Sequence, residues 1–256
     1  MRYTSTRNNQ TNVTAAQAIA TGISPEGGLY VPLQLPRLTA EDIRGLVSLS
    51  YKERAARVLS RFLGDFTAEE TAACCEAAYG DRFDSPAVAP VVELGEGRHI
   101  LELWHGPTCA FKDMALQILP HLMRVSVSKT APGQQIVILV ATSGDTGKAA
   151  LEGFRDAPDT RILVFYPVDG VSEMQRLQMI TQEGENVGVC AIRGNFDDAQ
   201  TGVKALFTDD EVIAALEKNG ILGGLKTEGG VLWCVTEKVS REELDRTVAI
   251  VKEVCA

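Results

Sequence analysis

One lysine lies where a nucleophile would be expected. Lys112 belongs to HGPTCAFKDMALQ, residues 105–117, which follows the apolar segment RHILELW and opens a segment with helical spacing. In open α/β sheets ligands bind beyond the carboxyl ends of the strands, so we expect this lysine at the mouth of a sheet. A lysine shielded from water can lose its proton and attack a carbonyl group. Lys112 is therefore a candidate nucleophile, and the alternative is a solvated lysine in a first helical turn.

A second segment predicts an anion site. ATSGDTGKAALEG, residues 141–153, follows the apolar strand QIVILV and turns abruptly into a helix. Glycines there let the main chain approach a ligand, and free N–H groups at a helix start attract a carboxylate or phosphate. The predicted binding residues are Ser143, Gly144, Asp145, Thr146 and Gly147. The alternative is an ordinary turn in which Ser143 or Asp145 caps the helix.

The same segment approaches the nucleotide P-loop pattern, because Gly147 and Lys148 lie between a strand and a helix. Thr142 stands where that pattern needs its first glycine, and Ala149 stands where it needs a hydroxyl. Neither the tight loop nor the magnesium ligand is available, which argues against a nucleotide triphosphatase.

A third polar group, Asn195 with Asp197 and Asp198, follows another apolar strand in RGNFDDAQTGVKALF. These residues are expected to cap a helix and complement its dipole. Paired carboxylates also suggest a metal or acid/base site, but nothing nearby in the sequence supplies further ligands. No metal site is predicted.

The elements that position these residues change character near residue 85. Before it, apolar residues at three- and four-residue spacings predict helices at 14–22, 39–49, 51–64 and 67–80, with GISPEGGLYVP as a structured loop. After it, apolar strands at 98–104, 135–142, 161–168 and 186–193 alternate with helices. This alternation predicts a parallel sheet covered on both faces.

Composition excludes several partners. The 256 residues are 45% hydrophobic and 23% charged, and the net charge of -9 offers no basic surface for nucleic acid or a membrane. No apolar stretch could span a bilayer, and the polar start lacks a signal peptide, so we expect a cytoplasmic protein. The six cysteines form no C-x-x-C pair, so we expect reduced thiols without zinc or disulfides.

Six segments, in order, resemble threonine synthase over about residues 1–220. They are YTSTRN, GISPEGGLYVP, HGPTCAFKDMALQ, ATSGDTGKAALEG, VFYPVDGVSEMQRLQM and RGNFDDAQTGVKALF. The resemblance implies an α/β fold of PLP (pyridoxal 5'-phosphate) fold type II, incomplete, with a helical N-terminal domain. It implies that Lys112 carries PLP and that residues 143–147 hold the substrate carboxylate, in agreement with the predicted anion site.

The family reaction converts O-phospho-L-homoserine and water into L-threonine and phosphate. PLP acts as an electron sink, and Lys112 is suited to move the substrate protons. The leaving phosphate needs cationic and N–H partners, for which Lys148 and Lys204 are plausible by charge alone. The resemblance implies nothing about the oligomeric state.

The last part of the chain departs from the family. Segments like SINWGR and PTGNFGN are not found, and about residues 224–256 resemble the closing strand and helix of glycine dehydrogenase (decarboxylating) subunit 1. The expected domains are therefore 1–85, helical; 86–222, a truncated PLP-binding α/β domain; and 223–256, a strand–helix tail.

Two functional interpretations remain open. The chain is either an active PLP-dependent lyase or an inactive fragment or fusion product with at most a binding role. A different PLP lyase, such as a dehydratase, is a weaker interpretation, because those enzymes usually have Asn where this loop has Asp145.

Overall fold

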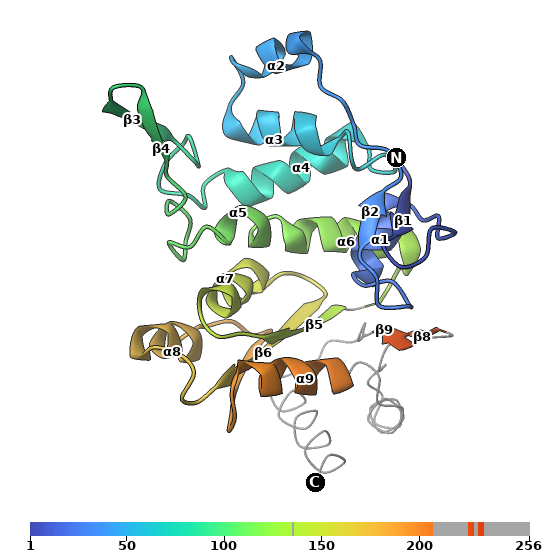
Figure 1. Cartoon of the computed structure of the whole chain (residues 1–256), viewed down its shortest axis with the longest axis vertical. Helices are drawn as coiled ribbons and strands as arrows, with labels where there is room; N and C mark the ends of the chain where they lie inside the picture. The colour runs from blue at the N-terminus through green and yellow to red at the C-terminus, as the bar shows by residue number, and fades with distance from the viewer. Residues whose placement is uncertain (135, 207–224, 228–229, 233–256) are drawn as a thin grey trace. The chain divides into compact units, whose positions relative to one another are not determined.

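A computed structural model describes residues 1–134, 136–206, 225–227 and 230–232 (Figure 1). The chain forms two compact units, Met1–Pro132 and Gly133–Ala256. Within the described residues, no helix is long and apolar enough to cross a membrane.

Four helices of the first unit lie where the sequence predicts them. They are α1 (Ala15–Thr21), α2 (Ala40–Leu46), α3 (Tyr51–Leu59) and α4 (Ala68–Tyr79). Each follows a threonine or serine that forms a capping box with the residue three positions later, so the first orphan N–H groups of each helix are satisfied. The capping residues are Thr14, Thr39, Ser50 and Thr67.

The N-terminal region also contains a small sheet that the helical prediction lacks. Strand β1 (Tyr3–Ser5) pairs antiparallel with β2 (Tyr30–Pro32), which closes the Gly- and Pro-rich loop. Three-residue strands are too short to show a period of two in the sequence, so the pattern could not reveal them.

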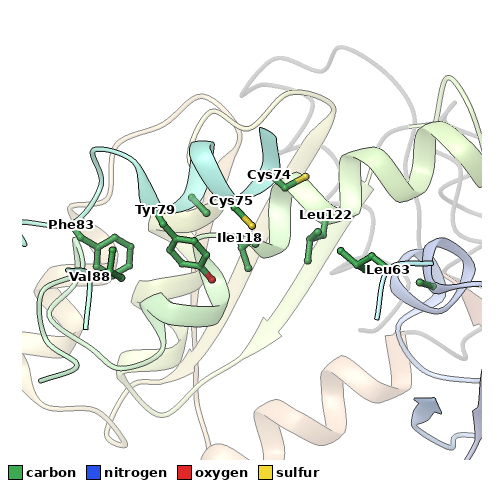
Figure 2. Packing of buried hydrophobic residues seen from close by; sticks show 10 residues of the cluster. Leu63, Cys74, Cys75, Tyr79, Phe83, Val88, Ile118 and Leu122 are labelled. Atoms are coloured by element: carbon green, nitrogen blue, oxygen red, sulfur yellow. The ribbon is translucent and has the colours of Figure 1, made fainter. Parts of the chain in front are cut away.

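The core of this unit forms where α4 meets α5 (Asp113–Leu116) and α6 (Leu119–Thr130). Figure 2 shows the ring of Tyr79 beside Cys75 and Ile118. The Tyr79 hydroxyl donates to the carbonyl oxygen of Met114 at 2.6 Å, and burial raises the pKa of this phenol. Because α6 packs against both α1 and α4, the compact unit extends to Pro132, beyond the predicted 85/86 boundary. The predicted domain boundaries stay predictions.

The strand before Lys112 differs from its prediction. Strand β4 (Arg98–Leu101) pairs antiparallel with β3 (Val91–Gly95), and its four residues are exposed. The chain reverses through Gly95, Glu96 and Gly97, all with positive φ, which is the backbone of a tight hairpin. The prediction that this strand belongs to the parallel sheet is therefore wrong for the described residues, and the position of Lys112 at the mouth of a sheet stays a prediction.

The second unit contains the predicted parallel sheet, in the order β5 (Ile136–Ala141), β6 (Thr160–Pro167) and β7 (Val187–Ile192). Helices α7 (Asp145–Phe154) and α8 (Glu173–Ile180) connect the strands, and α9 (Phe196–Leu206) follows β7. Figure 1 shows α7 and α9 on opposite sides of β5 and β6, and both helices contact β6. The predicted cover on both faces is confirmed for this sheet.

A short antiparallel pair, β8 (Leu225–Thr227) and β9 (Gly230–Leu232), is described near the C-terminus. The remainder of the predicted strand–helix tail, residues 233–256, lies outside the described residues. Its resemblance to glycine dehydrogenase subunit 1 stays a prediction.

Candidate functional site

Lys112 immediately precedes α5, and its backbone is already helical, with φ -60° and ψ -24°. The side chain is half-buried, and Nζ lies 4.7 Å from the ring centroid of Phe111. No carboxylate or hydrogen-bond acceptor contacts this ammonium within the part of the chain that the structure describes. An aromatic face attracts the cation weakly and leaves its N–H groups available.

The next residue, Asp113, fixes the backbone that carries Lys112. Its side chain is completely buried. Oδ2 accepts a hydrogen bond from the Thr108 N–H at 2.9 Å, and Oδ1 accepts one from the Thr108 hydroxyl at 2.9 Å. One carboxylate thus ties the loop before Lys112 to the helix after it.

A second buried polar side chain supports this carboxylate. Gln117, also fully buried, lies one helical turn beyond Asp113 and donates from Nε2 to Asp113 Oδ1 at 3.4 Å. Arg82 donates to Gln117 Oε1 at 2.9 Å, which fixes the orientation of the amide. Sequence reasoning missed Asp113 and Gln117, because an acidic residue in a first helical turn is normally solvated.

The histidine that opens the lysine motif is held between two carboxylates. His105 Nε2 lies 2.7 Å from Glu102 Oε2, and Nδ1 lies 2.5 Å from Asp84 Oδ1. Hydrogen bonds to Glu102 and then to Asp84 raise the pKa of His105, because the imidazolium can donate to both. The ring of Trp104 stacks on the imidazole with centroids 5.7 Å apart.

The predicted anion loop connects β5 to α7. Thr142 Oγ1 accepts hydrogen bonds from the N–H groups of Gly144 and Gly147, at 3.1 and 3.0 Å. A Cβ at Gly147 would lie 2.4 Å from Thr142 Cγ2, so the turn needs glycine there. The N–H groups of residues 143, 145 and 146 meet no acceptor among the described residues, and their side chains are exposed. Such a helix start suits an anion.

The local capping differs from the sequence prediction. Gly144 is the N-cap of α7 and has no side-chain cap, so neither Ser143 nor Asp145 caps the helix. The buried Thr142 takes the capping role from inside the turn. The sequence signal was present, since threonine caps are common, but the glycines that follow made the register ambiguous.

Lys148 has partners within its own unit. Its ammonium donates to Gln182 Oε1 and lies 3.7 Å from Glu152 Oε2, a carboxylate that Arg155 also contacts at 3.2 Å. The side chain of Lys204 lies outside the described residues.

Asn195, Asp197 and Asp198 form the predicted helix cap. Asn195 Oδ1 accepts from the N–H groups of Asp197 and Asp198, at 2.8 and 3.1 Å. Asp198 Oδ2 returns the interaction by accepting from the Asn195 N–H at 2.8 Å. No cluster of three or more potential metal ligands occurs among the described residues.

The structure brings some of the predicted site residues together. The loop at 143–147 follows β5, and the Asn195 cap follows β7, so both lie at the carboxyl edge of one parallel sheet. Ligands of open α/β sheets bind at this edge. Lys112 belongs to the other compact unit.

Comparisons with known proteins bear on these motifs. Residues 2–79 match the family model described as "Threonine synthase N terminus". The chain is 45% identical over 210 residues to the threonine synthase of Pseudomonas aeruginosa, covering 82% of this chain and 44% of that protein. The chain is similar to threonine synthases.

Solved structures agree. The PLP-bound threonine synthase from Brucella melitensis superimposes with a TM-score of 0.77 at 39% identity, covering 91% of this chain and 48% of that one. The Escherichia coli threonine synthase gives 0.72 at 32% identity, covering 84% and 48%. The α/β fold is therefore fold type II, and the chain spans about half the length of these three threonine synthases.

Proposed function

We propose that Lys112 binds PLP and that the loop at 143–147 binds the carboxylate of an amino-acid substrate. With this cofactor the chain acts as threonine synthases do, converting O-phospho-L-homoserine and water into L-threonine and phosphate. The observation that carries the proposal is the environment of Lys112. Its ammonium has no acidic partner among the described residues, while the buried Asp113 beside it fixes the backbone.

These residues fit PLP chemically. A lysine that bonds covalently to an aldehyde must not be held in an ion pair, and Lys112 contacts only an aromatic ring in the described part of the chain. Two ordered hydrogen bonds between Thr108 and Asp113 hold the loop that precedes it. The similarity to a PLP-bound threonine synthase supports the same cofactor.

Lys112 and the loop at 143–147 are each proposed to have a separate task. PLP, when bound, supplies an electron sink for a carbanion at the substrate α carbon. Lys112 moves protons at the α and β carbons once its nitrogen is free. The unpaired N–H groups of residues 143, 145 and 146 bind and orient the substrate carboxylate at the positive end of α7.

Several finer predictions belong with this proposal. The protein is expected in the cytosol, without a nucleic-acid or membrane partner, as its charge and composition indicate. Threonine synthase activity of this chain by itself is the most demanding of these predictions, because the chain spans about half the length of the threonine synthases it matches. The competing interpretation is a fragment that binds without catalysing.

Visible absorbance during titration with PLP tests cofactor binding. We expect an absorbance band for the wild-type chain that Lys112→Ala abolishes and Lys52→Ala keeps, since Lys52 is partly exposed and paired with Glu76 at 2.7 Å. Equal spectra for all three proteins would refute the assignment of Lys112.

Phosphate release then tests the reaction. The PLP-loaded chain should release phosphate from O-phospho-L-homoserine and form L-threonine, without deaminating L-threonine or L-serine. Deamination alone would favour a dehydratase. PLP binding without either reaction would favour the binding-only fragment.

A further inference from the structure

We propose that Gln175 is the positioning residue of the anion loop. Gln175 lies on α8, 30 positions after Asp145. It holds Asp145 and Gly144 in the conformation that leaves the N–H groups of the loop available to a ligand. The proposal rests on the function proposed above for residues 143–147.

The two ends of the Gln175 amide serve two different elements. Nε2 donates to Asp145 Oδ1 at 3.0 Å, and Oε1 accepts from the Ser172 N–H at 3.2 Å. The second contact belongs to the capping box that starts α8. One side chain therefore ties the first residue of α7 to the start of α8.

Gly144 packs directly against the same amide. A Cβ at Gly144 would lie 2.5 Å from Gln175 Nε2 and 2.8 Å from its Cδ. The amide could leave that space only by giving up its bonds to Asp145 and Ser172. Gln175 thus limits the loop by contact at Gly144 and by a hydrogen bond at Asp145.

Helix α8 is a firm support for this side chain. Met179, on α8, is completely buried. Just beyond α8, Gln182 accepts from Lys148 and donates to Glu152 Oε2 at 3.1 Å, and both partners lie on α7. Glutamine amides therefore join α8 to α7 near both ends of α8. The contacts of Gln182 would oppose a displacement of Gln175 alone.

The chemistry of an amide separates the two contacts experimentally. The Ser172 N–H needs an acceptor, whereas the Asp145 carboxylate needs a donor. Gln175→Glu keeps an acceptor for the capping box but places a like charge against Asp145. Adding Asp145→Asn restores a donor–acceptor pair with its direction reversed, so the double variant should recover the loop.

Amide hydrogen exchange of the ligand-free chain tests the positioning role. The N–H groups of Gly144 and Gly147 are the reporters, because Thr142 accepts from both. We expect Gln175→Glu to speed their exchange about tenfold, the effect of losing one hydrogen bond to a charged group. The exchange of α8 amides should stay unchanged, and Gln175→Glu with Asp145→Asn should return both reporters to within about threefold of wild type.

Gln178→Glu is the matched control, with the same substitution one turn further along α8. Unchanged exchange at Gly144 and Gly147 in Gln175→Glu would overturn the proposal. So would equal acceleration throughout α8, or failure of the double variant to recover, since either would reduce Gln175 to a helix cap.

A titration with L-threonine, followed at the amides of residues 143–147, separates this proposal from the function on which it rests. We expect wild type to respond and Gln175→Glu to need about tenfold more L-threonine. If no amide of the wild-type loop responds while the exchange results hold, the proposed function fails and the structural role of Gln175 stands.

Discussion

Removal of the Asp113 carboxylate tests whether this buried group holds the lysine loop. In Asp113→Ala, the Thr108 N–H, the Thr108 hydroxyl and the Gln117 amide all lose their acceptor inside the protein. The hydroxyl can rotate toward another acceptor, and the Gln117 bond is long at 3.4 Å. The stranded Thr108 N–H dominates, so we expect a loss of about 2–4 kcal/mol in the free energy of unfolding.

Asp113→Asn should cost less, about 1 kcal/mol. Its amide oxygen can replace Oδ2 opposite the Thr108 N–H, while its NH₂ group faces the Thr108 hydroxyl, which can turn to accept. Gln117 then loses its acceptor, and it cannot flip without losing the bond from Arg82.

Urea unfolding followed by circular dichroism measures these differences, and exchange of the Thr108 amide localises them. Asp81→Ala is the control, since Asp81 is exposed in the same unit. If Asp113→Ala stays within about 0.5 kcal/mol of wild type, the range of ordinary surface substitutions, the carboxylate does not hold the loop.

Three further predictions concern pH, packing and capping. The pKa of His105 is raised in the folded state, so His105 contributes its full stabilisation of the fold below the unfolded-state pKa and loses it as pH rises through the folded-state pKa. The urea midpoint of the wild type should therefore fall over that pH rise. The same fall is expected in the control His99→Gln, and a weaker one in His105→Gln. Gly147→Ala should lower the free energy of unfolding by about 1–3 kcal/mol, because a Cβ there would lie 2.4 Å from the buried Thr142. Gly202→Ala should raise it by about 0.5–1 kcal/mol, because a Cβ at this position of α9 meets open space. Thermal melts that rank the two variants the other way would contradict this packing. Asn195→Ala should lower the free energy of unfolding in urea by about 1 kcal/mol and leave the PLP absorbance band unchanged. Loss of that band would assign Asn195 to the cofactor site instead of a helix cap.

The sequence predicted the elements that carry strong local signals. Helices α1 to α4 begin at Ser or Thr caps followed by regular apolar spacing, and β5 to β7 are long apolar runs. The prediction that Asn195 caps a helix also depended on local chemistry, and its hydrogen bonds confirm it.

Features that depend on distant residues were not predictable. The segment RHILELW carries the apolar residues expected of a sheet strand, yet β4 pairs with its neighbour β3 across the glycine turn. Nothing near Lys112 in sequence reveals that Asp113 is buried or that Arg82 supports it through Gln117. Gln175 has the sequence pattern of a capping box, and only the fold brings it to Asp145.

Borohydride reduction of the chain mixed with PLP, followed by peptide mass spectrometry, identifies the lysine that carries the cofactor. We expect the added cofactor mass on the peptide that contains Lys112, and we expect Lys112→Ala to remove it while Lys52→Ala does not. Cofactor mass spread over many lysines, or concentrated on a lysine other than Lys112, would contradict the proposed site.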